Sequence, residues 1–164
     1  MKNNNNPVCE KVSFAFSYNT VEEALLADSA YVARALYDVA LEKPSVASYI
    51  ITEDDKSFIV AHVPEACAHI ATRLAAYIAH DVQFHDEPYT FVLSLPSCRN
   101  VAIDSLILHE LLRAIVAYVL SQWYEVRLPD MAARQQQLYD AAIAMVRHDI
   151  FMARGIVRRA GSYM

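Results

Sequence analysis

The densest group of side chains that could bind a metal lies in the stretch HDVQFHDE, residues 80 to 87. It holds His80, Asp81, His85, Asp86 and Glu87. Imidazole and carboxylate groups ligate zinc and iron, but the two histidines are five positions apart, and ligands that share a helical face stand about three or four apart. A solvated helix end with a histidine near the C-terminal dipole explains the same residues. We therefore expect no metal here, and keep a small metal-dependent enzyme as an alternative.

A second candidate is LILHELLRA, because His109 and Glu110 match the first half of a zinc-protease motif. That motif needs a second histidine four positions after the first, and Arg113 occupies that place. Glu110 and Arg113 are instead spaced to pair on one helical face. Asp104 and Ser105 fall inside a helical pattern, where we expect solvated or capping roles. No GxSxG turn is present to expose a nucleophile, so we predict no catalytic residue.

The cysteines do not form a metal or redox motif. Cys9, Cys67 and Cys98 are an odd number without a CxxC pair, and the start MKNNNNPVCEK has no apolar core of a signal peptide. We expect reduced thiols in the cytosol. His62 and His69 flank Cys67 and could meet a metal across a strand-to-helix turn, but a packed thiol with two half-exposed imidazoles is the simpler interpretation.

Glycine is almost absent, since Gly155 and Gly161 are the two glycines in 164 residues. Loops that bind phosphate need glycines for positive backbone angles and for close approach of the backbone. P-loop and dinucleotide-binding motifs are therefore excluded, and we expect no cofactor.

Regular patterns run along the first half of the chain. VSFAFSY, residues 12 to 18, alternates large apolar and small side chains and predicts a strand. Thr20 is expected to cap a helix, with Glu23 reaching back to it, and that helix should run to Lys43 before Pro44. Residues 49–52 and 58–63 are predicted to form a β-hairpin around EDDKS.

Further elements follow in the second half. Pro64 and Glu65 suit the start of a second helix, and residues 90–95 predict another strand, ended by Pro96. A central helix of about 28 residues should start near Asn100, because its apolar residues form two faces.

The stretch WYEVRLPD interrupts this strongly helical half. A residue before proline avoids helical geometry, so Leu128 should end one helix while Pro129 starts the next. The last helix should carry an apolar stripe through residues 139, 143, 146, 150 and 153 and end near Gly155. Trp123 lies beside this turn, where it either packs in the core or hinge or, with Tyr124, contributes to an interface.

These patterns predict one α+β domain, mainly α, spanning residues 1–164: a helical bundle of about four helices with a small antiparallel β element. The Asn-rich residues 1–7 should be disordered. With 55% hydrophobic residues, the chain has apolar material to bury against a partner. Its longest central apolar run, residues 114–120, is far shorter than the roughly 20 residues that span a bilayer, so we expect no membrane association.

The C-terminal residues differ in charge from the rest. The whole chain has a formal net charge of −5. Residues 145–164, however, carry four arginines and a single acidic residue, Asp149. A frayed, solubilising end is one interpretation of residues 156–164. The other is a docking arm, in which Arg154, Arg158, Arg159 and Tyr163 bind an adjacent subunit. We do not expect nucleic acid as a partner, because no aromatic platform accompanies the arginines.

The stretch LHELLRAIVAYVLSQWYEVRLPDMAARQQQLYDAAIAMVRHDIFMARGIVRR, residues 108–159, resembles small helical structural proteins of tailed bacteriophages and prophages. In those proteins a helix ending in an aromatic pair near a Leu-Pro turn precedes a long helix with late arginines. The resemblance implies a neck or head-to-tail connector-like subunit that assembles into a ring.

We therefore expect a non-enzymatic phage or prophage structural or assembly protein that binds its own copies and other virion proteins. The resemblance implies that it is found in the cytoplasm of a bacterial host or in a virion. The alternatives are the metal-dependent enzyme that would use residues 80–87 and a cytosolic protein-binding module.

Overall fold

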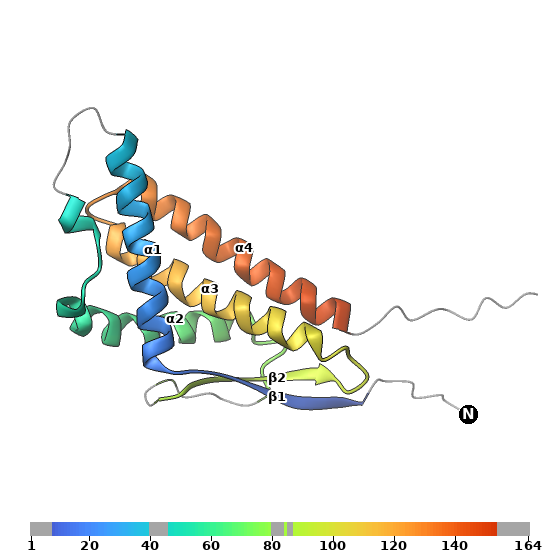
Figure 1. Ribbon diagram of the computed structural model, residues 1–164. Helices are drawn as coiled ribbons and strands as arrows, with labels where there is room; N and C mark the ends of the chain where they lie inside the picture. The colour runs from blue at the N-terminus through green and yellow to red at the C-terminus, as the bar shows by residue number, and fades with distance from the viewer. Residues whose placement is uncertain (1–7, 40–45, 80–83, 85–86, 154–164) are drawn as a thin grey trace, which may run out of the picture.

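The computed structural model describes residues 8–39, 46–79, 84 and 87–153 (Figure 1). Within these ranges it has four α-helices, two short 3-10 helices and a two-stranded antiparallel sheet, which confirms the expected mainly helical α+β class. The elements in chain order are β1 (Cys9–Phe16), α1 (Tyr18–Val39), η1 (Val46–Tyr49), η2 (Glu53–Asp55), α2 (Lys56–Arg73), β2 (Tyr89–Pro96), α3 (Ala102–Tyr124) and α4 (Pro129–Ala153). The expectations for residues 1–7, for the helix end at Lys43 and for residues 156–164 lie outside the described residues.

The sheet joins two segments that are far apart in the sequence. β1 pairs antiparallel with β2, with Phe14 opposite Phe91 and Phe16 opposite Tyr89. Phe14 and Phe16 are buried while Ser13 and Ala15 are exposed. The strand predicted from the alternation in VSFAFSY is therefore confirmed. One face of this ribbon therefore closes the core, where β2 contacts α2 and α4. Figure 1 shows the ribbon below the helices.

The predicted hairpin of residues 49–52 and 58–63 is wrong. Thr52 donates from both its backbone N–H and its hydroxyl to the Asp55 carboxylate, at 2.9 Å each, and this local pairing starts η2 and then α2. Phe58 to Val63 belong to α2, which buries Ile59 and Val63 four positions apart. The β-branched and aromatic side chains looked like a strand, but they form the apolar face of a helix.

α2 also runs through Pro64 instead of starting there. Proline removes one backbone donor and usually breaks a helix interior. Here it occupies the third turn of a helix whose burial continues beyond it through Ala66, Cys67 and Ile70. Tertiary packing has therefore outweighed the local cost of the proline.

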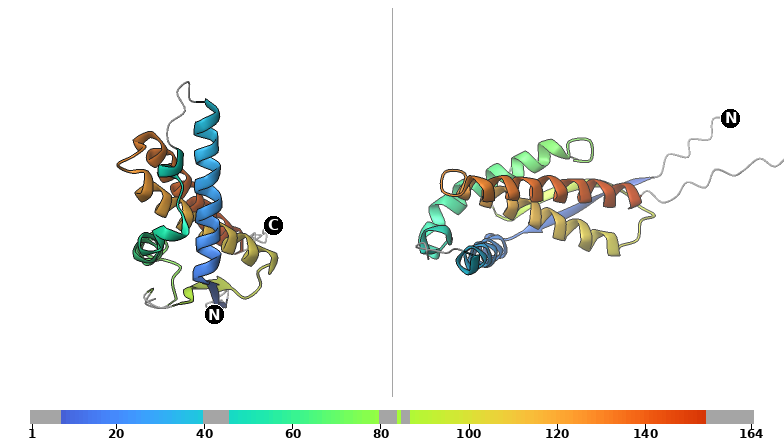
Figure 2. Two further views of the ribbon diagram at one scale, coloured as in Figure 1. Left: turned by 60° about the vertical axis from the view of Figure 1, so that its left-hand side comes forward. Right: turned by 90° about the horizontal axis from the view of Figure 1, so that it is seen from above.

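The start of α1 differs by about one turn from the expected position. The Ser17 side chain oxygen accepts a hydrogen bond from the Thr20 backbone N–H at 3.2 Å, so Ser17 does the capping that was predicted for Thr20. The helix then buries Val21 and Leu25. It crosses the other helices instead of running alongside them, and its second half extends beyond them (Figures 1 and 2).

α3 and α4 form the helical hairpin predicted at Leu128 and Pro129. α3 ends at Tyr124 and α4 begins at Pro129, and the Leu128 N–H donates to the Tyr124 carbonyl at 2.8 Å. Residues 114–121 of α3 are buried on every side, because α1, α2 and α4 surround that part of the helix (Figure 1). The predicted stripe of α4 is buried throughout, from Tyr139 to Ala153.

Candidate functional site

Trp123 lies at the junction where the end of α3 meets η1 and α2. Its Nε1–H donates to the Tyr49 carbonyl oxygen at 3.0 Å. Its ring meets the Phe58 ring edge-on, with centroids 5.0 Å apart, and the Arg127 guanidinium lies over it at 4.3 Å. Arg127 also donates to the Ser48 carbonyl at 2.9 Å. The indole is therefore part of a packed hinge that attaches η1 to the α3–α4 turn.

Tyr124 is fully buried inside the chain. Its hydroxyl has no hydrogen-bond partner within the described residues. Burial, together with the nearby Asp28 carboxylate, raises the pKa of Tyr124 to about 12. The ring has no surface available to a second protein in this structure, whereas Trp123 is only partly buried. The interface role stays a prediction, and Trp123 is the member of the pair that could take part directly.

The remaining predicted interface residues, Arg154, Arg158, Arg159 and Tyr163, lie outside the described residues. So do four members of the candidate metal cluster, His80, Asp81, His85 and Asp86, while Glu87 is described and exposed. Among the residues whose positions the structure gives, no group of three metal-binding side chains comes together.

The histidines around Cys67 do not converge on it. All three residues belong to α2, so the expected strand-to-helix turn between them does not exist. The His62 ring stacks on Phe58, with centroids 4.0 Å apart, and His69 lies against the Tyr118 ring. Cys67 is buried, which raises the pKa of its thiol to about 12. This arrangement agrees with the packed thiol that was the simpler interpretation.

The polar residues of α3 make local ion pairs. Glu110 and Arg113 pair as predicted, at 3.5 Å, and His109 is exposed. Asp104 accepts two hydrogen bonds from Arg99, at 2.7 and 2.8 Å. Arg99 also pairs with Glu10 of β1, so this guanidinium ties the sheet to the start of α3.

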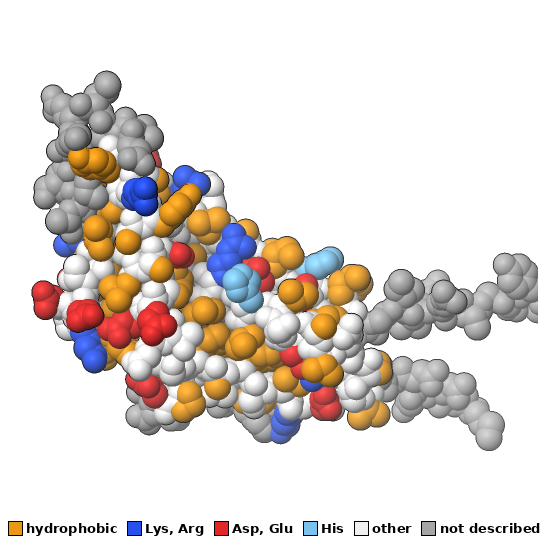
Figure 3. Space-filling model, viewed as in Figure 1, with side chains coloured by type: hydrophobic (Ala, Val, Ile, Leu, Met, Phe, Trp, Pro, Cys, Tyr) orange, Lys and Arg blue, Asp and Glu red, His pale blue; other side chains and the backbone are white. Residues whose placement is uncertain are grey.

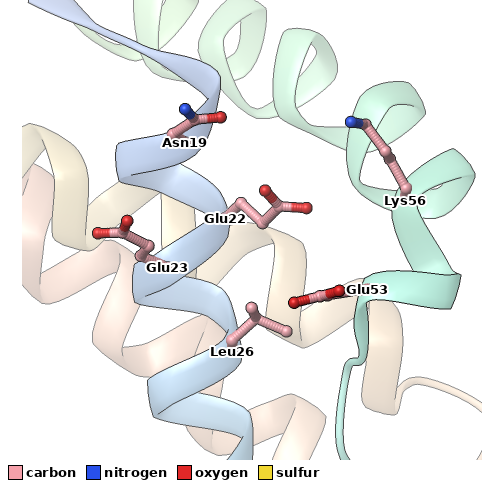
Figure 4. Close-up of a pocket in the computed structure, with 6 residues that line it drawn as sticks. All are labelled: Asn19, Glu22, Glu23, Leu26, Glu53 and Lys56. Atoms are coloured by element: carbon pink, nitrogen blue, oxygen red, sulfur yellow. The ribbon is translucent and has the colours of Figure 1, made fainter.

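An acidic hollow, which the sequence did not single out, lies between the start of α1 and the η2–α2 corner. It has a volume of about 500 Å³ and is lined by Asn19, Glu22, Glu23, Leu26, Glu53 and Lys56. Figure 4 shows Asn19 and Glu22 directed across the hollow toward η2 and α2, while Glu23 turns away. Acidic side chains gather on this part of the surface (Figure 3). Three carboxylates against a single lysine make it a surface suited to a basic partner.

The sequence contained a signal for this hollow. T-V-E-E and E-D-D were interpreted as the capping end of a helix and as the turn of a hairpin. E-D-D forms η2, whereas the two glutamates of T-V-E-E lie just after the first turn of α1. Only the packing of α1 beside η2 brings Glu22 and Glu53 to one surface.

Comparisons with known proteins found no matching family model, no similar curated protein and no similar solved structure. None of the helices in the described ranges is long and apolar enough to cross a bilayer.

Proposed function

We propose that this chain is a non-enzymatic structural or assembly protein of a tailed phage or prophage, similar to a neck or head-to-tail connector subunit. It would act by binding copies of itself and other virion proteins. The observation that supports this proposal is the acidic hollow between α1 and η2, taken together with the arginines that follow α4 in the sequence.

The acidic hollow lies at the end of the molecule where α1 begins beside η2, and α4 ends at Ala153 at the opposite end (Figures 1 and 2). In the sequence, Arg154, Arg158 and Arg159 follow directly after α4. A subunit with an acidic surface at one end and a basic segment attached at the other is suited to heterologous, head-to-tail contact. Such contacts close into rings when the rotation between subunits allows it.

The proposal is tested by comparing the mass of three proteins by light scattering at low and high salt. They are the full chain, a chain ending at Gly155, and the full chain with Glu22→Lys and Glu53→Lys. We expect the full chain to assemble at low salt and to dissociate at high salt, because exposed charges are screened over about 8–10 Å at moderate ionic strength. Both altered chains should fail to assemble while keeping their helical circular dichroism.

Glu125→Lys is the matched control, because Glu125 is exposed and lies outside the hollow. This variant should assemble like the unaltered chain. Equal masses for all proteins in every condition would refute head-to-tail association through these charges. The phage assignment is checked separately: genes for portal, capsid or tail proteins beside this gene would support it, and their absence would count against it.

The metal-dependent enzyme is distinguished by the metal content of the purified protein. Stoichiometric zinc or iron that is lost in His80→Ala would favour that alternative over an assembly protein.

A further inference from the structure

Two of the three cysteines, Cys9 and Cys98, lie at the same edge of the sheet. Cys9 is the first residue of β1, and Cys98 belongs to the turn that follows β2. Because the strands are antiparallel, the start of β1 lies beside the end of β2, below the start of α3 (Figure 1). Both cysteines are exposed, whereas Cys67 is buried in α2. The fold therefore brings together two accessible thiols that stand far apart in the sequence.

Contacts between the neighbours of the two cysteines hold this edge together. The Ser97 N–H donates to the Val8 carbonyl oxygen at 2.9 Å. The Arg99 guanidinium pairs with the Glu10 carboxylate, and the Arg99 side chain is only 7% exposed. The residue before and the residue after each cysteine are thus joined to a residue that flanks the other cysteine, once through the backbone and once through an ion pair.

The register of the sheet makes Cys98 a diagonal neighbour of Cys9. Cys9 is opposite Pro96, and Cys98 follows Pro96 by two positions. Diagonal neighbours in a sheet lie about 7–8 Å apart, whereas a disulfide joins residues whose Cα atoms are about 4.4–6.8 Å apart. The remaining movement, about 1 Å, is within the thermal motion of an exposed segment. Cys98 can make that movement without breaking strand pairing, because it stands in a turn, closed by the Arg99 N–H donating to the Pro96 carbonyl at 3.3 Å.

We propose that Cys9 and Cys98 form a redox pair, which a peroxide converts into an intramolecular disulfide that fastens β1 to the turn before α3. In the first step one thiol is oxidised to a sulfenic acid, while the peroxide O–O bond breaks and water leaves. In the second step the other thiol attacks the sulfenic sulfur, the S–S bond forms, and the hydroxyl group leaves as a second water. The two thiols lose two electrons and two protons in total, and one hydrogen peroxide becomes two waters.

The disulfide changes how the first strand is attached. β1 is held by its pairing with β2 and by the burial of Phe14 and Phe16. A covalent bond at its start closes a long loop, and such a bond stabilises a protein mainly by restricting the unfolded chain. This inference does not depend on the proposed assembly role, because it uses neither the acidic hollow nor the residues after Ala153.

The pair is tested by treating the reduced full chain with hydrogen peroxide, both folded in buffer and unfolded in urea. The remaining thiols are then alkylated, and mass spectrometry of the intact protein and of its peptides identifies each disulfide. We expect the folded chain to lose two hydrogens and to link Cys9 to Cys98, while Cys67 stays a thiol. The chain oxidised in urea should give mixed pairs that include Cys67. The folded, oxidised chain should also unfold at a urea concentration about 1 M higher than the reduced chain, and Cys98→Ser should abolish this shift.

A folded chain that yields only sulfinic acids or covalent dimers would overturn the inference, and so would disulfides to Cys67 at the same frequency. A second measurement is the rate of closure. Glu10→Ala removes the ion pair with Arg99 and should slow disulfide formation severalfold, while both reduced thiols are alkylated as fast as before. Asp140→Ala is the matched control, because it breaks another exposed ion pair, with Arg73 at 3.1 Å, and should leave the rate unchanged. Equal rates for both variants would show that contacts at this edge do not hold the cysteines together, and would also overturn the inference.

Discussion

Replacing Trp123 with alanine tests the account of the hinge most directly. The change removes the hydrogen bond to the Tyr49 carbonyl, the edge-on contact with Phe58 and the ring beneath Arg127. A hydrogen bond contributes about 0.5–1.5 kcal/mol, an aromatic pair about 0.5–1.5 kcal/mol, and an exposed cation–π contact about 0.5–1 kcal/mol. Because Trp123 is only partly buried, the loss should fall near the lower end of the range for tryptophan truncation, at about 3 kcal/mol.

The assay is urea unfolding followed by far-ultraviolet circular dichroism, because Trp123 is the only tryptophan in the chain and its fluorescence disappears with it. Trp123→Phe keeps a ring against Phe58 but loses the Nε1–H donor, so it should cost less, about 1–2 kcal/mol. Val126→Ala is the matched control: Val126 is 90% exposed in the same turn, and the change should stay within about 0.5 kcal/mol. A loss below about 1 kcal/mol for Trp123→Ala, with the fold intact, would show that the indole does not hold η1 in place.

Two further predictions concern groups whose pKa is raised by burial. In the folded protein a thiol reagent should modify the exposed Cys9 and Cys98 quickly at neutral pH. It should modify Cys67 only after unfolding, because Cys67 is buried and the pKa of its thiol is raised to about 12. Rapid modification of all three cysteines would show that the α2 face opens readily. The pKa of Tyr124 is raised to about 12 in the folded protein, against an ordinary value of about 10. As the pH rises, the Tyr124 hydroxyl therefore loses its proton in the unfolded state before it does so in the folded state. Stability should therefore fall as the pH rises from about 10 to 12, and Tyr124→Phe should flatten that decline in alkaline urea titrations; an unchanged slope would contradict this role for Tyr124.

The elements that were predictable from the sequence are those whose pattern is local. The α4 stripe repeats every three or four residues, and the strand at Phe14 and Phe16 alternates, so each pattern identifies its element without knowledge of a partner. The Leu128–Pro129 turn was predictable for a similar reason, because proline restricts the residue before it.

The segment from Thr52 to Val63 shows where local patterns fail. Its β-branched and aromatic residues favour a strand, while the hydrogen bonds from Thr52 to Asp55 favour a helix start. Either pattern is compatible with the sequence alone. Packing decides between them, because the helix buries Ile59, Val63 and Ile70 against the core.

The candidate sites depended on tertiary structure even more. The sequence by itself determined the kinds of residues available: few glycines, a turn beside the single tryptophan, and arginines late in the chain. It could not determine that Glu22 shares a hollow with Glu53, or that Trp123 donates to Tyr49, 74 positions away. Neighbours within a helix follow from its repeat, whereas contacts between distant segments depend on which apolar faces pack together once the intervening loops close.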